Sequence, residues 1–401
     1  WWSRIRSAQG LCLAKALRPF SKDRRSFKLT FSNRVYDELG IKPVIHAAGT
    51  ITSFGGSMPR PEVIEAMALA STSFVGLIEL NEKVGEYIAQ VTGAEAGMVV
   101  SGAAGGVVLS MAACMTGNNV GFVRQLPNTT GMKNELAIQK IHRGGYSDMY
   151  TFAGAKFNEA GSVNGCLAEE LDLAINENTA AVAYLFAPGV LTNGLTLSEV
   201  SEIAHSRGVP VIVDAAAMLP PKSNLRRYIS EGADLVTMSG GKYIRGPQGA
   251  GLLFGRKDLI EAATLNTAPN HSIGRPQKVT KDEMIGLHTA LKLFMETDDE
   301  AQYLEYRETL APIQEKLKHV QGIDVSIKQT ASKYHVPTLV IGLKSSESGR
   351  NPNDLLKQLL DGEPRVFMTY DANEDAMSVN PINLQPGEGP LLGARLAEVL
   401  G

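Results

Sequence analysis

From about Gly97 onward, short apolar runs alternate with segments of helical periodicity, and this alternation restricts the fold more than any other feature. Runs of β-branched and apolar residues separated by amphipathic helices are typical of βαβ units and of a mostly parallel sheet. The runs are "GMVV", "LAIQKI", "AAVAYLF", "VPVIVDA", "DLVTMS" and "GAGLLFG". Between the third and fourth runs, "LSEVSEIAHSRG" predicts a helix with Ser198 as its N-cap and Gly208 at its end. The sequence therefore predicts an α/β domain with helices on both faces of the sheet.

The pattern changes past Arg275, where long charged helices are followed by short strands and a last helix, "GARLAEVL". A chain of 401 residues suits one large domain and one smaller domain. We expect a basic N-terminal arm over residues 1–34, a large domain over 35–275 and a small α+β domain over 276–401. Two amphipathic segments, "RPEVIEAMALA" and "NEKVGEYIAQVTG", suit either a subunit interface or a cover for the sheet.

The net charge of −3 hides an asymmetry between the N-terminal arm and the rest of the chain. The first thirty residues hold eight Lys or Arg and one Asp, a balance of +7, which leaves −10 for the remainder. An acidic body has no general attraction to nucleic acid, because Lys and Arg contacts to phosphate supply most of that affinity. We therefore do not expect tRNA as a partner. The arm itself is Arg-rich and acid-poor, as targeting segments are, but it begins without Met, so a remnant of an upstream reading frame is an equal alternative.

The apolar runs, cysteines and histidines exclude several other classes of protein. The longest apolar runs fall far short of the roughly 20 residues that a membrane helix needs. Cys12, Cys114 and Cys166 form no C-x-x-C pair, and no H-x-x-x-H spacing occurs. We expect neither a disulfide framework nor a metal site, and we expect Cys114 to be a buried helix residue in a reducing cytoplasm.

The residues that follow the predicted strands are the candidates for a binding site, because ligands of open α/β sheets bind beyond the carboxyl ends of the strands. They are Ser101 with the small residues after it, His142, Pro188, Asp214 and the turn 239–242. In "VVSGAAGGVVL", a helix opens directly after a strand, so its free N–H groups and positive end favour a phosphate. The residues of this loop are Ser101, Gly102, Ala103 and Ala104. Close packing of helix on strand is the alternative reason for such small residues.

Asp214 and Lys242 form the most informative pair in the sequence. Asp214 ends the run "VPVIVD" and precedes three alanines, the second of which is Ala216, so a flat ring has room beside the carboxylate. A lone Asp there would suit an N-cap, but Lys242 follows roughly thirty residues later in the glycine turn "SGGKYIRGPQGAG". In pyridoxal phosphate enzymes an Asp partners the pyridinium nitrogen and a Lys forms the Schiff base. His142 suits stacking on that ring and Ser239 suits its phosphate, although each has an ordinary structural alternative.

Five segments in the same order carry a resemblance to a known family. They are "GAEAGMVVSGAAGGVVLSMAACMTG", "IVDAAAMLPP", "SGGKYIRGPQGAGLLFGRKDLI", "PNHSIGRPQKVTKDEMIGLHTAL" and "VNPINLQPGE". From about Val35 to its end, the chain resembles the branch of fold-type I pyridoxal phosphate enzymes that contains bacterial selenocysteine synthase and D-glucosaminate-6-phosphate ammonia-lyase. The resemblance implies a large domain with a mostly parallel seven-stranded sheet, a small C-terminal domain, and a homodimer or higher oligomer with active sites at the subunit interface. It also implies Lys242 as the Schiff-base residue and Asp214 as the pyridinium partner.

One segment departs from the family pattern. Relatives often have N-A-A-G-T where this chain has "HAAGT" with His46, and a basic residue where this chain has Ser53. This departure bears on the substrate rather than on the cofactor. The candidate substrate-binding residues are Arg245, Gln248, Arg275, Lys278, Ser57 and His46. The three arginine and lysine side chains among them suit a phosphate or a carboxylate, or are solvated surface cations.

The predicted activity is that of an ammonia-lyase. The substrate would be a small 2-amino-3-hydroxy acid resembling D-glucosaminate 6-phosphate, and the products a 2-keto-3-deoxy acid and ammonia. Lys242 is the expected base at the α-carbon, because its pKa would be depressed beside a cationic cofactor. The alternatives are a selenium transferase acting on seryl-tRNA, a racemase or aldolase on the same scaffold, and a family member without catalytic activity.

Overall fold

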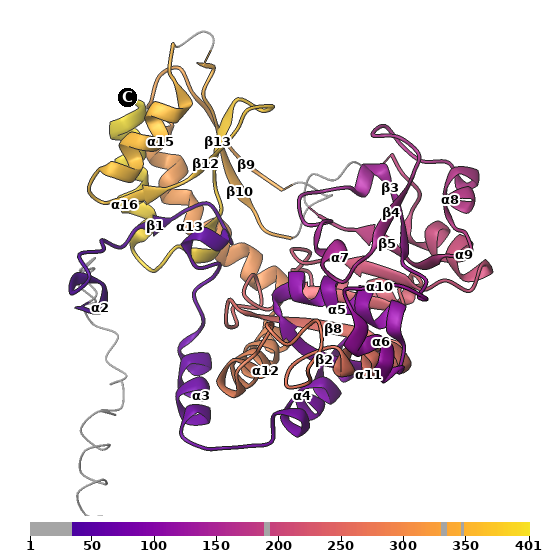
Figure 1. Cartoon of the computed structure of the whole chain (residues 1–401). Helices are drawn as coiled ribbons and strands as arrows, with labels where there is room; N and C mark the ends of the chain where they lie inside the picture. Colours follow the sequence, from indigo (N-terminus) through magenta and orange to yellow (C-terminus); the bar gives the residue numbers. More distant parts are fainter. Residues whose placement is uncertain (1–33, 188–192, 330–334, 346–348) are drawn as a thin grey trace, which may run out of the picture. The chain divides into compact units, whose positions relative to one another are not determined.

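A computed structural model describes residues 34–187, 193–329, 335–345 and 349–401 of the chain (Figure 1). The expected basic arm, with Cys12, and Pro188 lie outside these residues. The chain divides into two compact units, Trp1–Pro43 and Val44–Gly401. In the first unit the described residues include one short helix, α2 (Arg34–Asp37). All further elements belong to the second unit.

The centre of the second unit is a seven-stranded sheet with the order β2-β8-β7-β6-β5-β3-β4. Its strands are β2 (Ala96–Ser101), β3 (Glu135–Gln139), β4 (Lys156–Ala160), β5 (Thr179–Leu185), β6 (Val211–Asp214), β7 (Leu235–Ser239) and β8 (Ala250–Gly255). Only β8 runs antiparallel to its neighbours. The prediction of a mostly parallel, seven-stranded α/β sheet is therefore confirmed, and six of its strands lie on the six apolar runs.

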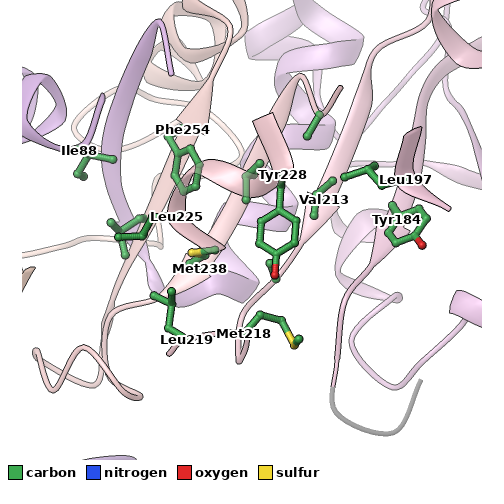
Figure 2. Close-up of a cluster of buried hydrophobic side chains, with 14 of the residues drawn as sticks. Ile88, Tyr184, Leu197, Val213, Met218, Leu219, Leu225, Tyr228, Met238 and Phe254 are labelled. Atoms are coloured by element: carbon green, nitrogen blue, oxygen red, sulfur yellow. The ribbon is translucent and has the colours of Figure 1, made fainter. Parts of the chain in front are cut away.

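Strand residues alternate between two apolar layers, as the period of two in a β-strand requires. On β6, Val213 joins one buried cluster and Ile212 joins the cluster on the opposite face. On β8, Phe254 and Leu253 divide between the two faces in the same way. Figure 2 shows the first layer, in which Tyr228 of a helix and Phe254 of the sheet lie among the same group of side chains. Because both faces are buried, these central strands have continuous apolar sequences rather than alternating ones.

Helices cover both faces of the sheet. Helix α5 (Gly102–Thr116) packs on one face together with α7 (Met149–Phe152) and α11 (Lys257–Leu265). The opposite face is covered by α4 (Leu77–Thr92), α8 (Ala168–Ala174), α9 (Leu197–Ser206), α10 (Asn224–Ser230) and α12 (Lys281–Glu296). The remaining elements around this sheet are α3 (Pro61–Ser71), α6 (Val120–Gln125), and the short 3-10 helices η1 (Thr52–Phe54) and η2 (Lys140–His142). None of the helices in the described part of the chain combines the length and hydrophobicity needed to cross a bilayer.

Helix α9 begins earlier than the sequence interpretation placed it. Its N-cap is Thr196, whose hydroxyl accepts a hydrogen bond from the N–H of Glu199, while the Glu199 carboxylate binds the Thr196 N–H. This capping box satisfies two N–H groups at the helix start, which Ser198 cannot do from inside the first turn. The predicted N-cap at Ser198 is therefore wrong, whereas Gly208, with a φ of 68°, does follow the end of the helix.

The C-terminal part of the chain forms a second, antiparallel sheet with the order β12-β13-β10-β9. Its elements are α13 (Asp299–Leu317), β9 (Asp324–Lys328), β10 (Thr338–Gly342), α15 (Pro352–Asp361), β12 (Thr369–Asp371), β13 (Ala376–Val379), η3 (Pro381–Asn383) and α16 (Glu388–Leu400). A two-stranded parallel pair, β1 (Ile45–His46) with β11 (Val366–Phe367), joins residues from opposite ends of the unit. The predicted α+β character of this part is confirmed, and the domain boundary at 275–276 stays a prediction.

Candidate active site

Three polar residues lie at the carboxyl ends of strands of the large sheet. Ser101 ends β2, Asp214 ends β6 and Ser239 ends β7. Strands β2 and β7 both pair antiparallel with β8, with Ser101 opposite Ala250 and Ser239 opposite Gly251. Since β6 pairs parallel with β7, all three strands end in the same direction. The structure thus gathers these candidate residues at the carboxyl edge where α/β proteins bind their ligands.

The carboxylate of Asp214 is buried at this edge with little compensation. Its side chain is 8% exposed, and its Oδ1 accepts a hydrogen bond of 3.0 Å from the N–H of Ala216. Burial raises the pKa of the Asp214 carboxyl to about 6, and the nearby charge of Lys242 opposes this rise. A buried carboxylate that is only partly satisfied favours a positively charged partner such as a protonated ring nitrogen.

Lys242 lies in a turn whose shape is fixed by its own backbone. The N–H of Gly240 binds the Ala250 carbonyl, the N–H of Gly246 binds the Gly240 carbonyl, and both distances are 2.9 Å. Burial lowers the pKa of the Lys242 ammonium, while the charge of Asp214 opposes the change. A lysine with a lowered pKa has more of its amine in the neutral, nucleophilic form, which Schiff-base chemistry needs.

His142 and Asp214 line one cavity of about 300 Å³. The imidazole is 3% exposed and meets the ring of Tyr184 edge-on, with 4.2 Å between the ring centroids. Burial lowers the pKa of His142 to about 4, so the ring is neutral at physiological pH. Its Nδ1 has no hydrogen-bond partner among the residues that the structure describes. A neutral flat ring beside a carboxylate suits stacking on a heteroaromatic cofactor, as the sequence suggested.

Several aromatic and hydroxyl side chains of this cavity were missed by sequence reasoning. They are Tyr146, Ser147, Tyr150 and Tyr184. Tyr184 lies inside the run "AAVAYLF", which was predicted only as a strand, and its hydroxyl donates to the Leu195 carbonyl at 3.2 Å. A polar aromatic residue near the carboxyl end of a buried strand was the available signal.

The first turn of α5 lies against the sheet and leaves its N–H groups uncapped. Ser101 is the N-cap residue, but its side chain makes no capping hydrogen bond. The hydroxyl of Thr237 donates to the Ala103 carbonyl at 3.2 Å. A Cβ on Gly251 would lie 2.5 Å from the carbonyl carbon of Gly102, so only glycine allows strand and helix to approach this closely. Ser101, Gly102, Ala103 and Ala104 therefore form a rigid, positive helix end suited to a phosphate.

The segment before α3 braces the lysine turn. The N–H and Oγ of Ser57 both bind the Gly241 carbonyl, at 3.1 and 3.0 Å. Gln248 donates from Nε2 to the Thr52 carbonyl at 2.9 Å. Ser57 and Gln248, two of the candidate substrate-binding residues, therefore form hydrogen bonds within the protein. These bonds connect the segment before α3 to the lysine turn and stabilise the conformation of the turn.

His46 is buried beside aromatic rings and lacks a polar partner. Its ring centroid lies 5.6 Å from that of Phe54 and 5.5 Å from that of Phe367. Neither ring nitrogen has a hydrogen-bond partner within the described ranges, and burial lowers the pKa of the imidazole. His46 is therefore a neutral ring at physiological pH, and its surroundings are mainly apolar.

Two asparagines of the C-terminal part reach the same region, and sequence reasoning missed both. Asn383 donates from Nδ2 to the carbonyls of Gly49 and Gly56, at 2.7 and 2.9 Å. Asn380 donates from Nδ2 to the Tyr243 hydroxyl at 2.8 Å, next to Lys242 in the chain. Both asparagines are 6% exposed. They join the loop after β13 to the segments that shape the lysine turn.

Arg275 and Lys278 lie at a different cavity. This larger cavity has a volume of about 1060 Å³ and is also lined by Phe74, Val75 and Ile78. Neither Asp214 nor His142 lines it. Within this chain the structure does not bring these two cations together with the carboxylate and the imidazole.

The gathered residues fit pyridoxal phosphate on four separate features. They supply a buried acid for the ring nitrogen, a lysine with a lowered pKa, a neutral ring for stacking and an uncapped helix end for the phosphate. In the described residues no group of three or more His, Cys, Asp or Glu side chains could hold a metal ion. The four features together suit an organic cofactor bound through an imine, an ion pair and a phosphate.

Comparison with known proteins agrees with this geometry. The family model described as "SelA: L-seryl-tRNA selenium transferase" matches residues 44–359. D-glucosaminate-6-phosphate ammonia lyase from Salmonella typhimurium is 33% identical over 371 residues, which cover 91% of this chain and 97% of that protein. A solved structure of a D-glucosaminate-6-phosphate ammonia-lyase superposes with a TM-score of 0.82 at 31% identity, covering 92% of this chain and 98% of that one.

A further relative has a different activity. The 5'-C-glycyluridine monooxygenase-decarboxylase of a Streptomyces species is 30% identical over 386 residues, covering 94% of both chains. The predicted family and fold-type I architecture are confirmed by these matches. Relatives at about 30% identity thus have different reactions, and the residues of the site determine the substrate.

Proposed function

Because this chain belongs to the L-seryl-tRNA selenium transferase family of pyridoxal phosphate enzymes, we propose that it is an ammonia-lyase of 2-amino-3-hydroxy acids. The substrate class is that of a phosphorylated amino sugar acid such as D-glucosaminate 6-phosphate. The observation that carries the proposal is the similarity to the ammonia-lyase along 97% of that protein, with a TM-score of 0.82 for the solved ammonia-lyase structure. The substrate loses its amino group as ammonia and becomes a 2-keto-3-deoxy acid. Water lost from the β-carbon is regained when the nitrogen is released, so the atoms balance.

Each residue of the site has a defined part in this reaction. When bound, pyridoxal phosphate withdraws electrons from the substrate α-carbon and makes its proton acidic. The amine of Lys242 takes that proton, which its lowered pKa favours. Asp214 supports the chemistry only while ionised, since its negative charge holds a proton on the ring nitrogen. His142 covers one face of the ring and, being neutral, adds no competing charge.

Two other chemistries would use the same residues. The monooxygenase-decarboxylase relative favours, as the second candidate, an oxygen-dependent loss of carbon dioxide from an amino acid. The family description favours transfer of selenium to a seryl-tRNA. The net charge of −10 outside the first thirty residues argues against this activity, because binding of tRNA needs a basic surface. Each has its own product, so one set of assays separates them.

The test combines ammonia, keto-acid and gas measurements on the cofactor-loaded protein. Purified protein is incubated with D-glucosaminate 6-phosphate, with its unphosphorylated form, with serine and with seryl-tRNA. Stoichiometric ammonia and 2-keto acid from the first substrate support the proposal, and the Lys242→Ala protein serves as the inactive control. Oxygen uptake with carbon dioxide release would support the monooxygenase-decarboxylase activity instead. A product found only on tRNA would support the selenium transferase activity.

We also propose a homodimer that places the larger cavity at the subunit interface. Phe74 is 101% exposed and Val75 and Ile78 are about half exposed, so the rim of the cavity presents apolar surface to solvent. A second copy would bury this surface and bring Arg275 and Lys278 toward the partner's active site. Light scattering should give a dimer mass for the natural protein and a monomer mass for Phe74→Asp. A Phe74→Asp protein that remains a dimer would show that the interface lies on another surface.

We also propose a cytoplasmic location, which is consistent with the free thiols of Cys114 and Cys166.

A further inference from the structure

We propose that Arg60 and Arg245 form a second anion-binding site, beside the lysine turn, that takes the anionic end of the substrate. This inference rests on the proposed substrate class, and its ligand is an oxyanion, either a phosphate ester or a carboxylate. The sequence marked Arg245 as one of several candidate cations, whereas Arg60 carried no prediction. Neither residue lines the cavity of Asp214 or the cavity of Arg275.

Arg245 is held in a fixed position by unusual backbone geometry. Its φ of 59° lies in the left-handed region, which non-glycine residues seldom adopt, and Gly246 follows directly. The N–H of Arg245 binds the Lys242 carbonyl at 2.9 Å, and its Nε donates to the Met58 carbonyl at 2.9 Å. Strained residues of this kind gather at functional sites. The backbone therefore keeps a bulky cation three residues from the catalytic lysine where a glycine would be the easier choice.

Arg60 is anchored two residues beyond Met58, again by neutral groups only. Its Nη2 donates to the Thr297 hydroxyl at 3.1 Å and its Nη1 to the Leu293 carbonyl at 3.5 Å. Arg60 is also the N-cap residue of α3, with no side-chain capping bond. These contacts orient the guanidinium without neutralising it.

The two guanidinium groups share one environment that lacks a close counter-ion. In the part of the chain that the structure describes, no carboxylate lies within 4.0 Å of either group. Burial and the charge of Arg60 lower the pKa of Arg245, while Tyr306, Glu305 and Glu62 oppose this change. Tyr306 interacts electrostatically with both arginines, and burial raises its pKa to about 12, so its hydroxyl remains a neutral donor.

Two partly buried arginines and a phenol form a set of donors without an acceptor of matching charge. Guanidinium groups bind phosphate and carboxylate through paired hydrogen bonds, more strongly than neutral donors do. An oxyanion between them would neutralise the repulsion of two like charges. The backbone of Ser57–Arg60 runs from the Gly241 carbonyl to this pair, so the site adjoins the lysine turn. The arrangement suits a substrate whose charged end points away from the cofactor phosphate.

The experiment uses cofactor-loaded protein, in which the helix end of α5 is filled by the phosphate of pyridoxal phosphate. Inorganic phosphate is titrated by calorimetry into the natural protein and into Arg245→Gln, Arg60→Lys and Thr297→Val. We expect at least tenfold weaker binding for Arg245→Gln and a smaller loss for Arg60→Lys, which keeps the charge but lacks the paired donors. Thr297→Val removes an anchor of Arg60 without removing charge, so phosphate binding should weaken less than in Arg245→Gln.

Steady-state kinetics then identify which anion occupies the site. A phosphate-ester site raises KM for the phosphorylated substrate in Arg245→Gln and leaves KM for its unphosphorylated form unchanged. A carboxylate site raises both. Equal phosphate affinity in Arg245→Gln and the natural protein would overturn the inference, whatever the reaction is. If no sugar acid reacts but phosphate binding still falls in Arg245→Gln, the anion site stands and only the proposed substrate fails.

Discussion

Replacing Asp214 by Asn should stabilise the cofactor-free protein while removing its activity. In the folded chain burial raises the pKa of this carboxyl to about 6, against 3.8 for the unfolded chain. At pH values between 3.8 and about 6, the Asp214 carboxyl therefore keeps its proton in the folded state but has lost it in the unfolded state. The stability of the folded state consequently falls as the pH rises through that window. An asparagine avoids this cost and still accepts the hydrogen bond from Ala216.

The size of the effect follows from the pKa difference. A shift of one unit corresponds to 1.36 kcal/mol, so the rise from 3.8 to about 6 corresponds to about 3 kcal/mol at pH 8. About half of that difference should remain at pH 5, where the folded carboxyl is mostly protonated. The Asp214→Asn protein should therefore exceed the natural protein in free energy of unfolding, and by more at pH 8 than at pH 5.

Urea unfolding of both apoproteins at the two pH values measures this difference. Asp172→Asn is a matched control, because Asp172 is exposed and its hydrogen bond with Arg207 lowers rather than raises its pKa. That control should show no gain in stability at pH 8. Equal differences at pH 5 and pH 8, or a less stable Asp214→Asn protein at pH 8, would refute the idea that burial of this carboxylate is costly.

Four further expectations concern the lysine turn and its surroundings. Gly56→Ala should destabilise the fold far more than Gly55→Ala. Both glycines have positive φ, but only at Gly56 would the new Cβ lie 2.8 Å from the Gly241 carbonyl oxygen. Thermal unfolding compares the two variants, and equal decreases in melting temperature would contradict this close contact. Asn383→Ala should lower the free energy of unfolding by about 2–4 kcal/mol, because the carbonyls it serves become unsatisfied, and a loss below 1 kcal/mol in urea would show that water replaces it. His142→Phe should keep cofactor affinity within a few fold while His142→Ala loses at least tenfold, as measured by the cofactor absorbance; equal losses would argue against stacking. Borohydride should fix cofactor to the natural protein but not to Lys242→Ala, and a labelled peptide from another lysine would contradict the assignment.

The fold was largely predictable because each central strand is buried on both faces and so forms an unbroken apolar run. Strand β4 was missed for the opposite reason, since "KFNEA" is an edge strand with partly exposed residues and little apolar pattern. The N-cap of α9 was misplaced although a Thr-x-x-Glu signature, Thr196 to Glu199, was present. Local sequence patterns were thus sufficient to predict most elements. The Thr196–Glu199 pattern would also have given the correct N-cap of α9.

The site was only half predictable, and the division follows sequence distance. Asp214 ends one predicted strand and Lys242 follows another, so topology alone places them at one edge of the sheet. The role of Asn383 depends on carbonyls more than 320 residues away, and no pattern near it encodes that contact. Ser57 was expected to meet substrate, yet its hydroxyl donates to the backbone of Gly241. Such long-range pairings arise from the packed fold and leave no periodic trace.

Because antiparallel β8 lies between β2 and β7, the sheet itself fixes the distance between the two ends of the site that bind the cofactor. Neighbouring strands lie about 4.8 Å apart, so the ends of β2 and β7 are separated by about 10 Å whatever side chains they carry. The distance between the first turn of α5 and the start of the lysine turn is therefore set by the spacing of the strands and not by the length of the loops. Rim loops can diverge toward new substrates without changing that span, which gives a physical reason why one scaffold serves relatives with such different reactions.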